Sequence, residues 1–215
     1  LGALVNIVRP GGGGASVGLV PIYTDNFDAG SGWYEHNGDA ATLGYDAGRY
    51  RISISGSQQQ AISDSSFRGS TDGTSYTHLG DVSINVSAMS ASESGLFGVT
   101  CRQSSGAASY YEGLVGHDGT VRIARYSDHR LRPLAQTRGP ELNRETFTRL
   151  RLDCIGTGGP TRLRLYVDNR QVADATDEDG LAKGSIGVSL ATGSADRAEV
   201  LFDDLVVFGH RADRL

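Results

Sequence analysis

The residues with the clearest potential for chemistry are two adjacent carboxylates, Asp203 and Asp204, in the segment FDDLVVFG near the C-terminus. The residues around them are apolar and typical of a β-strand, where an unpaired charge is costly to bury. Three interpretations follow: a catalytic pair, a metal site, or a strand that enters the core from its solvated end. Both faces of this strand are apolar, so side-chain alternation does not decide which carboxylate points inward.

Other segments match catalytic or metal-binding patterns only in part. GASVG, residues 14–18, has the spacing of a nucleophile elbow, but Ser16 lies in a glycine-rich linker and no helix is predicted after it. The acidic segment TDEDG, residues 176–180, is predicted to be a turn. The histidines are scattered without metal-binding spacing, so we predict no zinc site.

The elements that must position these residues are predicted to be β-strands. From residue 21 onward, apolar and polar residues alternate in short segments separated by glycine-rich turns, and Asp118-Gly119 is a strong hairpin signal. The clearest segments are GRYRISISG, DVSINVSAM, TVRIARY, RLRLDCIG, TRLRLYVDN and GSIGVSLAT. This pattern predicts an all-β fold, a two-sheet antiparallel β-sandwich of the jelly-roll type.

Alternation also places the two cysteines. Cys101 shares a face with Phe97 and Val99, and Cys154 shares a face with Leu150 and Leu152, so both sulfurs point to the apolar side. We predict a disulfide between them, which suits an exported protein. The alternative is two free, buried cysteines.

Taken together, these segments resemble the concanavalin A-like jelly-roll domains of bacterial cell-surface proteins. The residues that carry the resemblance span about 21–209, from DNFDAGSGW through GLFGVTCR and SYYEGLVGHDGTVRIARY to FDDLVVFG. These domains are similar to laminin-G-like and glucanase-like modules and are often appended to membrane-anchored proteins. The resemblance implies two antiparallel sheets with the first and last strands adjacent; it leaves the function open.

The predicted outward face of the cysteine-bearing strands is rich in Arg, Asp and Tyr. In lectin-like relatives a sheet face of this kind binds sugars, because planar guanidinium and carboxylate groups hydrogen-bond hydroxyls while aromatic rings stack. The alternative is a solvated face of Arg–Asp pairs. The candidate ligand-binding residues are Arg102, Tyr110, Tyr111, Glu112, Arg151, Asp153, Arg164 and Tyr166. For Glu112 the alternative is an ordinary exposed strand residue, and Trp33 is expected in the core.

The resemblance also raises the question of calcium. Jelly-roll binding modules often hold a structural calcium ion where the first and last strands meet, with carboxylate ligands from both. The candidate ligands are Asp25, Asp28, Asp203 and Asp204. The alternative is that one aspartate accepts hydrogen bonds while another meets water. No cofactor is required by the sequence.

Composition limits the partners and the location. The net charge of −5 is mildly acidic without a basic block, so nucleic acid is not expected as a partner. No apolar run reaches the roughly 20 residues of a membrane-spanning helix. We interpret residues 1–20 as an arm or linker that follows an anchor or signal, 21–209 as the jelly-roll domain and 210–215 as a tail. We therefore expect an extracytoplasmic protein, secreted or tethered to the cell surface.

These observations favour a non-catalytic recognition module that binds a glycan or a cell-surface protein. Glucanases of similar fold carry their carboxylates as E-x-D-x-x-E on one strand, and no segment here has that spacing. An enzyme related to glycoside hydrolases is therefore a secondary alternative. The other alternative is a structural subunit of a membrane-anchored complex, assembled through the N-terminal arm.

Overall fold

The computed structural model describes residues 18–30, 32–64, 79–90, 92, 94–194 and 197–210. The predicted N-terminal arm, apart from residues 18–20, and the end of the predicted tail lie outside the described residues. Strands extend over the predicted domain, together with one short 3-10 turn, η1 (Ser105–Ala107). The strands are β1 (Val20–Asp25), β2 (His36–Asn37), β3 (Ala41–Tyr45), β4 (Tyr50–Ser55), β5 (Gln60–Asp64), β6 (Val82–Met89), β7 (Leu96–Gln103), β8 (Tyr110–Val115), β9 (Thr120–Ser127), β10 (Arg130–Arg138), β11 (Thr148–Ile155), β12 (Thr161–Val167), β13 (Arg170–Asp177), β14 (Ser185–Ala191) and β15 (Arg197–Gly209).

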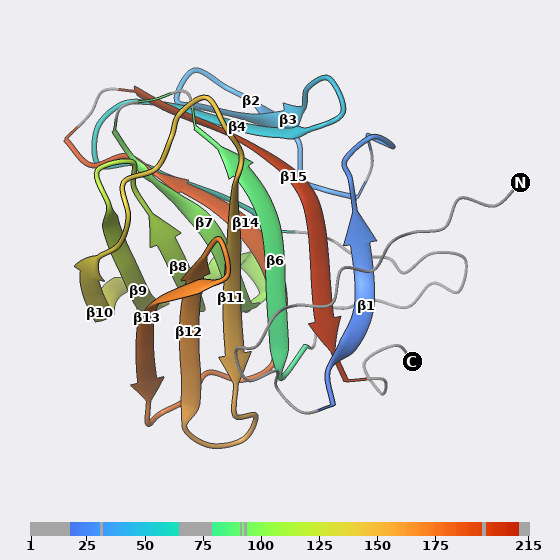
Figure 1. Ribbon diagram of the computed structural model, residues 1–215, viewed down its shortest axis with the longest axis vertical. Helices are drawn as coiled ribbons and strands as arrows, with labels where there is room; N and C mark the ends of the chain where they lie inside the picture. Colours follow the sequence, from blue (N-terminus) through green and yellow to red (C-terminus); the bar gives the residue numbers. More distant parts are fainter. Residues whose placement is uncertain are drawn as a thin grey trace, which may run out of the picture.

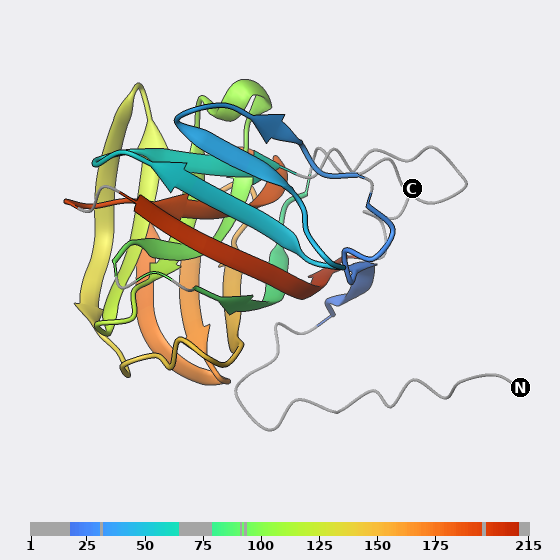
Figure 2. The same cartoon turned by 90° about the horizontal axis from the view of Figure 1, so that it is seen from above.

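The strands form two antiparallel sheets that pack as a sandwich, which confirms the predicted fold class (Figure 1). A nine-stranded sheet has the order β13-β12-β11-β6-β15-β4-β3-β2, with β1 also paired to β15. A six-stranded sheet has the order β10-β9-β8-β7-β14-β5. The first strand pairs with the last one, as the resemblance implied. Figure 2 shows the long β15 crossing the molecule beside β4 and β3.

The core lies between the sheets and is built by alternation. Ile52 and Ile54 of β4 and Ile84 of β6 point inward and are fully buried, while the residues between them are half-buried. Trp33 is also buried, as expected, and packs against Phe27 and Tyr50. The period-two pattern therefore predicted the inner faces of these strands correctly.

The predicted disulfide is present. Cys101 of β7 and Cys154 of β11 are bonded, and their Cα atoms are 6.8 Å apart. Because β7 belongs to the six-stranded sheet and β11 to the nine-stranded sheet, the bond crosses the core and ties the two layers together. Among the described residues, no helix is long and apolar enough to cross a membrane.

Candidate functional site

The outer face of the six-stranded sheet has a buried carboxylate at its centre. Alternation along β8 turns Tyr111 and Val115 toward the core and places Glu112 on the opposite, outer face. Glu112 is nevertheless 0% exposed, which is unusual for a charged residue on an outer face. The alternative interpretation of Glu112 from the sequence, an ordinary exposed strand residue, is therefore wrong.

A contact across the sheet shows that this outer face is concave. Gln60 lies on β5, and two strands, β14 and β7, separate β5 from β8. At about 4.8 Å per strand, the backbones of β5 and β8 are about 14 Å apart in a flat sheet. Yet Nε2 of Gln60 donates a hydrogen bond of 2.7 Å to Oε2 of Glu112. The side chains converge because the sheet curves around them.

The carboxylate of Glu112 organises the polar groups of this concave face. Nη2 of Arg122 on β9 lies 2.8 Å from its other oxygen, Oε1. The amide of Gln60 also contacts the hydroxyl of Ser189 at 3.0 Å and accepts a hydrogen bond from the hydroxyl of Tyr110 at 3.3 Å. Desolvation by burial raises the pKa of Glu112, and the charge of Arg122 and the hydrogen bond from Gln60 oppose that rise.

An apolar shelf lies beside this polar cluster. Tyr110 and Tyr126 are partners in the β8–β9 register, and their rings stack with centroids 5.0 Å apart and planes 17° apart. On β10, Leu131 pairs with Tyr126, and Leu131 and Pro133 are both exposed. We call Gln60, Tyr110, Glu112, Arg122, Tyr126, Leu131, Pro133 and Ser189 the concave-face site.

Four other predicted ligand-binding residues meet on the outer face of the nine-stranded sheet. Arg151 and Asp153 of β11 lie beside Tyr166 and Arg164 of β12 in register, as the alternation predicted. The guanidinium of Arg151 lies over the ring of Tyr166, 3.6 Å from its centroid. Asp153 lies 3.5 Å from Nε of Arg151 and 3.7 Å from Nη2 of Arg164. This arrangement is close to the alternative interpretation, a face of Arg–Asp pairs.

The prediction that Arg102 shares this exposed face is wrong. Arg102 lies on β7 of the other sheet and is 2% exposed. Its Nη1 donates to Oγ1 of Thr161 at 2.6 Å and to the carbonyl oxygen of Leu181 at 2.9 Å. Tyr111 is likewise fully buried between the sheets, where its ring cannot serve as a surface platform.

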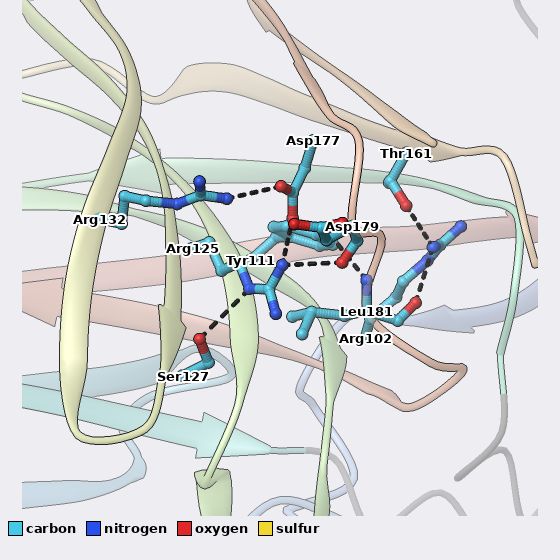
Figure 3. A network of polar contacts seen from close by, with 9 residues as sticks. All are labelled: Arg102, Tyr111, Arg125, Ser127, Arg132, Thr161, Asp177, Asp179 and Leu181. Atoms are coloured by element: carbon cyan, nitrogen blue, oxygen red, sulfur yellow. Dashed lines mark hydrogen bonds and ion pairs between the residues drawn. The ribbon is translucent and has the colours of Figure 1, made fainter. Parts of the chain in front are cut away.

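Both residues belong to a polar network that sequence reasoning missed, centred on Asp177 at the end of β13 (Figure 3). Its Oδ2 accepts hydrogen bonds from the hydroxyl of Tyr111 at 2.7 Å and from Nη1 of Arg125 at 2.8 Å. Its Oδ1 accepts one from Nη2 of Arg132 at 2.6 Å. The donors come from β8, β9 and β10, so the network joins the six-stranded sheet to β13 of the other sheet. The sequence predicts TDEDG to be a turn, whereas Asp177 is the last residue of β13 and is buried.

The four predicted calcium ligands do not converge. Asp25 accepts hydrogen bonds from the backbone nitrogen of Phe27, from the hydroxyl of Tyr23 and from Nε1 of Trp33. Asp28 and Asp204 are exposed, and Asp203 accepts a hydrogen bond from the backbone nitrogen of Asp204. Within the described part of the chain, no three His, Cys, Asp or Glu side chains gather as metal ligands would.

A local irregularity explains the adjacent carboxylates. Between Asp203 and Val206 the register of β15 against β6 shifts, and Asp204 has a φ of 50°. This is a β-bulge, which interrupts alternation, so Phe202 and Leu205 both point inward and neither carboxylate does.

Comparisons with known proteins bear on the fold. No protein-family model and no curated protein matches the chain. Among solved structures, the carbohydrate binding module CBM66 from Bacillus subtilis is 16% identical with a TM-score of 0.63, covering 83% of this chain and 96% of that one. A Bacillus subtilis protein of unknown function with a galectin-like fold is 12% identical with a TM-score of 0.65, covering 89% and 98%. The chain has the concanavalin A-like jelly-roll fold.

The same jelly roll also resembles an enzyme. A prokaryotic beta-1,3-1,4-glucanase (lichenase) derived from a mouse hindgut metagenome is 12% identical with a TM-score of 0.60, covering 87% of this chain and 98% of that one. At these identities the comparisons establish the fold, and the function has to be argued from the site.

Proposed function

We propose that this protein is a non-catalytic, extracytoplasmic module that recognises a glycan through the concave-face site. One observation carries the proposal: the buried Glu112 holds the side chains of Arg122 and Gln60 in place beside a shelf of stacked tyrosines. Side chains that are fixed before binding lose little conformational entropy when the ligand arrives. The likeness to a carbohydrate binding module supports the same function.

The chemistry of the site suits both the hydroxyl groups and the apolar C–H face of a sugar ring. Arg122 presents a guanidinium group that can donate hydrogen bonds to hydroxyl oxygens. Both amide protons of Gln60 are engaged by Glu112 and Ser189, so Gln60 can contribute only a further lone pair of Oε1 as an acceptor. The half-buried ring of Tyr126, which stacks on the buried Tyr110, and the exposed Leu131 offer apolar surface for the C–H groups of the sugar. Because the charge of Arg122 is balanced by Glu112, we expect a neutral glycan rather than an acidic one at this site.

The geometry argues against glycoside hydrolysis, although a lichenase shares the fold. A retaining glycosidase needs two carboxylates about 5 Å apart, each able to reach the sugar. Glu112 is fully buried, one of its oxygens contacts Arg122 and the other accepts a hydrogen bond from Gln60. The concave-face site as defined above contains one carboxylate, and the engagement of both its oxygens supports a role in positioning Arg122 and Gln60.

The extracytoplasmic location is proposed from the disulfide. Disulfides persist in oxidising compartments, and Cys101–Cys154 is buried in the core, which favours export. The rival idea of an assembly subunit depends on the N-terminal arm, of which only residues 18–20 belong to the described residues.

A screen of neutral oligosaccharides followed by calorimetry tests the proposal. Arg122→Gln and Tyr126→Ala should each weaken binding of the best ligand at least about tenfold, while Arg162→Gln, on the other sheet, should leave it unchanged. Equal affinity in all three variants would remove the concave face from the proposal. Release of reducing ends from a ligand, lost in Glu112→Gln, would instead establish an enzyme.

A further inference from the structure

The outer face of the nine-stranded sheet carries a concentration of arginine that the concave-face site does not use. Its outward side chains include Arg149, Arg151, Arg162 and Arg164, on the adjacent strands β11 and β12, with Asp153 and Asp174 as the carboxylates on β11–β13. We propose that this arginine face is a second site, which binds an anionic polysaccharide bearing carboxylate or sulfate groups.

The arginines form a regular array. Asp153 pairs with Arg164 and Arg151 with Tyr166 in the β11–β12 register, and Ile155 pairs with Arg162. Same-face residues along a strand are about 7 Å apart, so successive rows of the register at this spacing each contribute one arginine. Stacking on Tyr166 holds the plane of Arg151 in one orientation. A linear polymer with regularly spaced anionic groups can contact several of these arginines at once.

The carboxylates on this face do not neutralise all of the arginines. Arg162 is paired closely with Asp174, at 2.6 Å. Asp153 is shared between Arg151 and Arg164 at 3.5 and 3.7 Å, which are long distances for an ion pair, and these two arginine side chains are 17% and 18% exposed. Arg149 is exposed. Asp168, in the turn after β12, lies beside Arg149, whose backbone nitrogen donates a hydrogen bond to its Oδ1 at 3.0 Å. The four arginines therefore exceed the three aspartates by one charge, on a protein whose net charge is −5. This local excess favours an anionic ligand.

The neighbouring strand favours a sugar polymer over other polyanions. Beside the arginines, β6 presents Ser83, Asn85 and Ser87, in register with Asp153, Arg151 and Arg149. Hydroxyl and amide groups can hydrogen-bond sugar hydroxyls, whereas a membrane surface also takes apolar side chains. Single-stranded nucleic acid requires exposed aromatic rings on which bases stack, and Tyr166 is buried beneath Arg151.

Paired polymers that differ only in charge test the proposal. Binding of fluorescein-labelled polygalacturonate and dextran sulfate is followed by anisotropy, with methyl-esterified polygalacturonate and dextran as neutral counterparts. We expect both anionic polymers to bind at about 10 mM salt, to weaken strongly at about 300 mM salt, and the neutral counterparts not to bind.

Variants locate the site. Arg149→Gln/Arg164→Gln should weaken binding at least about tenfold, and Asp174→Asn, which removes a competing carboxylate, should strengthen it about threefold. The matched control Arg130→Gln/Arg138→Gln removes the same charge from β10 of the other sheet and should change affinity less than about twofold. Because Asp174→Asn is expected to strengthen polymer binding, the test does not rest only on losses of binding that a destabilised variant could also cause.

Three outcomes would overturn the inference: equal binding of charged and esterified polymers, equal losses in the β10 control, or tighter binding of DNA or anionic lipid vesicles through the same arginines. None of these bears on the concave-face site, because neutral oligosaccharide binding is measured separately in the same variants.

Discussion

Two buried carboxylates, Glu112 and Asp177, have pKa values that are shifted in opposite directions. Both are penalised by desolvation, which is the largest influence on each. For Glu112 this penalty prevails and its pKa is raised. For Asp177 the hydrogen bonds from Tyr111 and Arg125 and the charges of Arg125 and Arg132 outweigh desolvation, and its pKa is lowered. The number of charged partners therefore decides whether a buried acid is held ionised.

Asp177→Asn should destabilise the protein and change its response to acid. Removing one partner of a buried charge network leaves the others unpaired, at a cost of about 3 kcal/mol in the free energy of unfolding. Because the folded-state pKa of Asp177 lies below its unfolded value of about 3.9, its stabilisation is present above that pH and is lost as the pH falls.

Urea unfolding between about pH 6 and 3 measures both effects. The variant should lose less of its stability toward low pH than the wild type does. Parallel pH profiles would show that the ionised form of Asp177 contributes nothing.

Asp203→Asn should have the opposite effect on the free energy of unfolding and stabilise the protein at neutral pH. Desolvation is the largest influence and raises the pKa of Asp203, and the charges of Asp204 and Asp28 act in the same direction. The hydrogen bond from the backbone nitrogen of Asp204 and the charge of Arg49 at 3.8 Å oppose this rise without cancelling it. A raised folded-state pKa means that the ionised carboxylate destabilises the protein at neutral pH and that the penalty fades as the pH falls through that pKa. The asparagine keeps the oxygen that accepts from the nitrogen of Asp204. After allowance for solvent screening we expect a gain of about 0.3 kcal/mol at pH 7 that vanishes near pH 3, measured by urea unfolding. A loss at pH 7 would contradict it.

At the scale of elements, the disulfide between β7 and β11 should contribute substantially to stability. It closes a loop of 53 residues, and constraining the unfolded chain to that extent is worth about 4 kcal/mol in the chain-entropy model. The double variant Cys101→Ala/Cys154→Ala should therefore unfold at a markedly lower denaturant concentration than the oxidised protein. The reduced wild type serves as the control, because it keeps both side chains. If reduction leaves the midpoint unchanged, the crosslink does not act through the unfolded state.

Gly184 marks a close approach between β14 and β7. A Cβ at this position would lie 2.4 Å from the carbonyl oxygen of Gln103 and 2.6 Å from the carbonyl carbon of Arg102, which are backbone atoms and cannot easily move. Gly184→Ala should thus destabilise the protein by about 2 kcal/mol or more. Gly193→Ala is the matched control, since a Cβ there has no atom within 4 Å. Thermal unfolding of the two variants should separate them clearly, and equal midpoints would contradict the predicted clash.

The inner faces of the strands could be predicted because alternation is a local property of the sequence. Alternation fails at bulges. At β7, Cys101 and Arg102 together stand opposite Ile186, and Arg102 has a φ of 50°. The extra residue turns Arg102 inward, where strict alternation from Cys101 predicted an outward side chain. The bulge beside Asp204 also interrupts alternation, but there it leaves both carboxylates pointing outward. Neither bulge has a clear mark in the sequence.

The concave-face site was predictable only in part. Tyr110 and Glu112 were identified from their residue types on a predicted strand. Gln60 and Arg122 were not, because their contacts with Glu112 depend on strand order and sheet curvature, and both are properties of the whole fold.

At the scale of the molecule, the sandwich separates two kinds of surface. The concave-face site and the arginine face lie on the outer sides of opposite sheets, with the core between them. On the concave face the one arginine of the site is neutralised by Glu112, whereas the four arginines of the arginine face exceed its three aspartates by one. Because the sites share no residue and the core is closely packed, ligands at the two faces should bind independently.

Simultaneous binding is therefore the expected behaviour of the whole protein. In a competition experiment, a saturating neutral oligosaccharide should leave the affinity for labelled polygalacturonate unchanged within about twofold, and the reverse titration should agree, because coupling between sites is reciprocal. Raising the salt to about 300 mM should release the polymer and leave the oligosaccharide bound, since only the polymer is held by charges that salt screens. The variants should also separate the two sites: Arg122→Gln should weaken binding of the oligosaccharide alone, and Arg149→Gln/Arg164→Gln should weaken binding of the polymer alone. Displacement of one ligand by the other would mean that both bind to a single face of the sandwich.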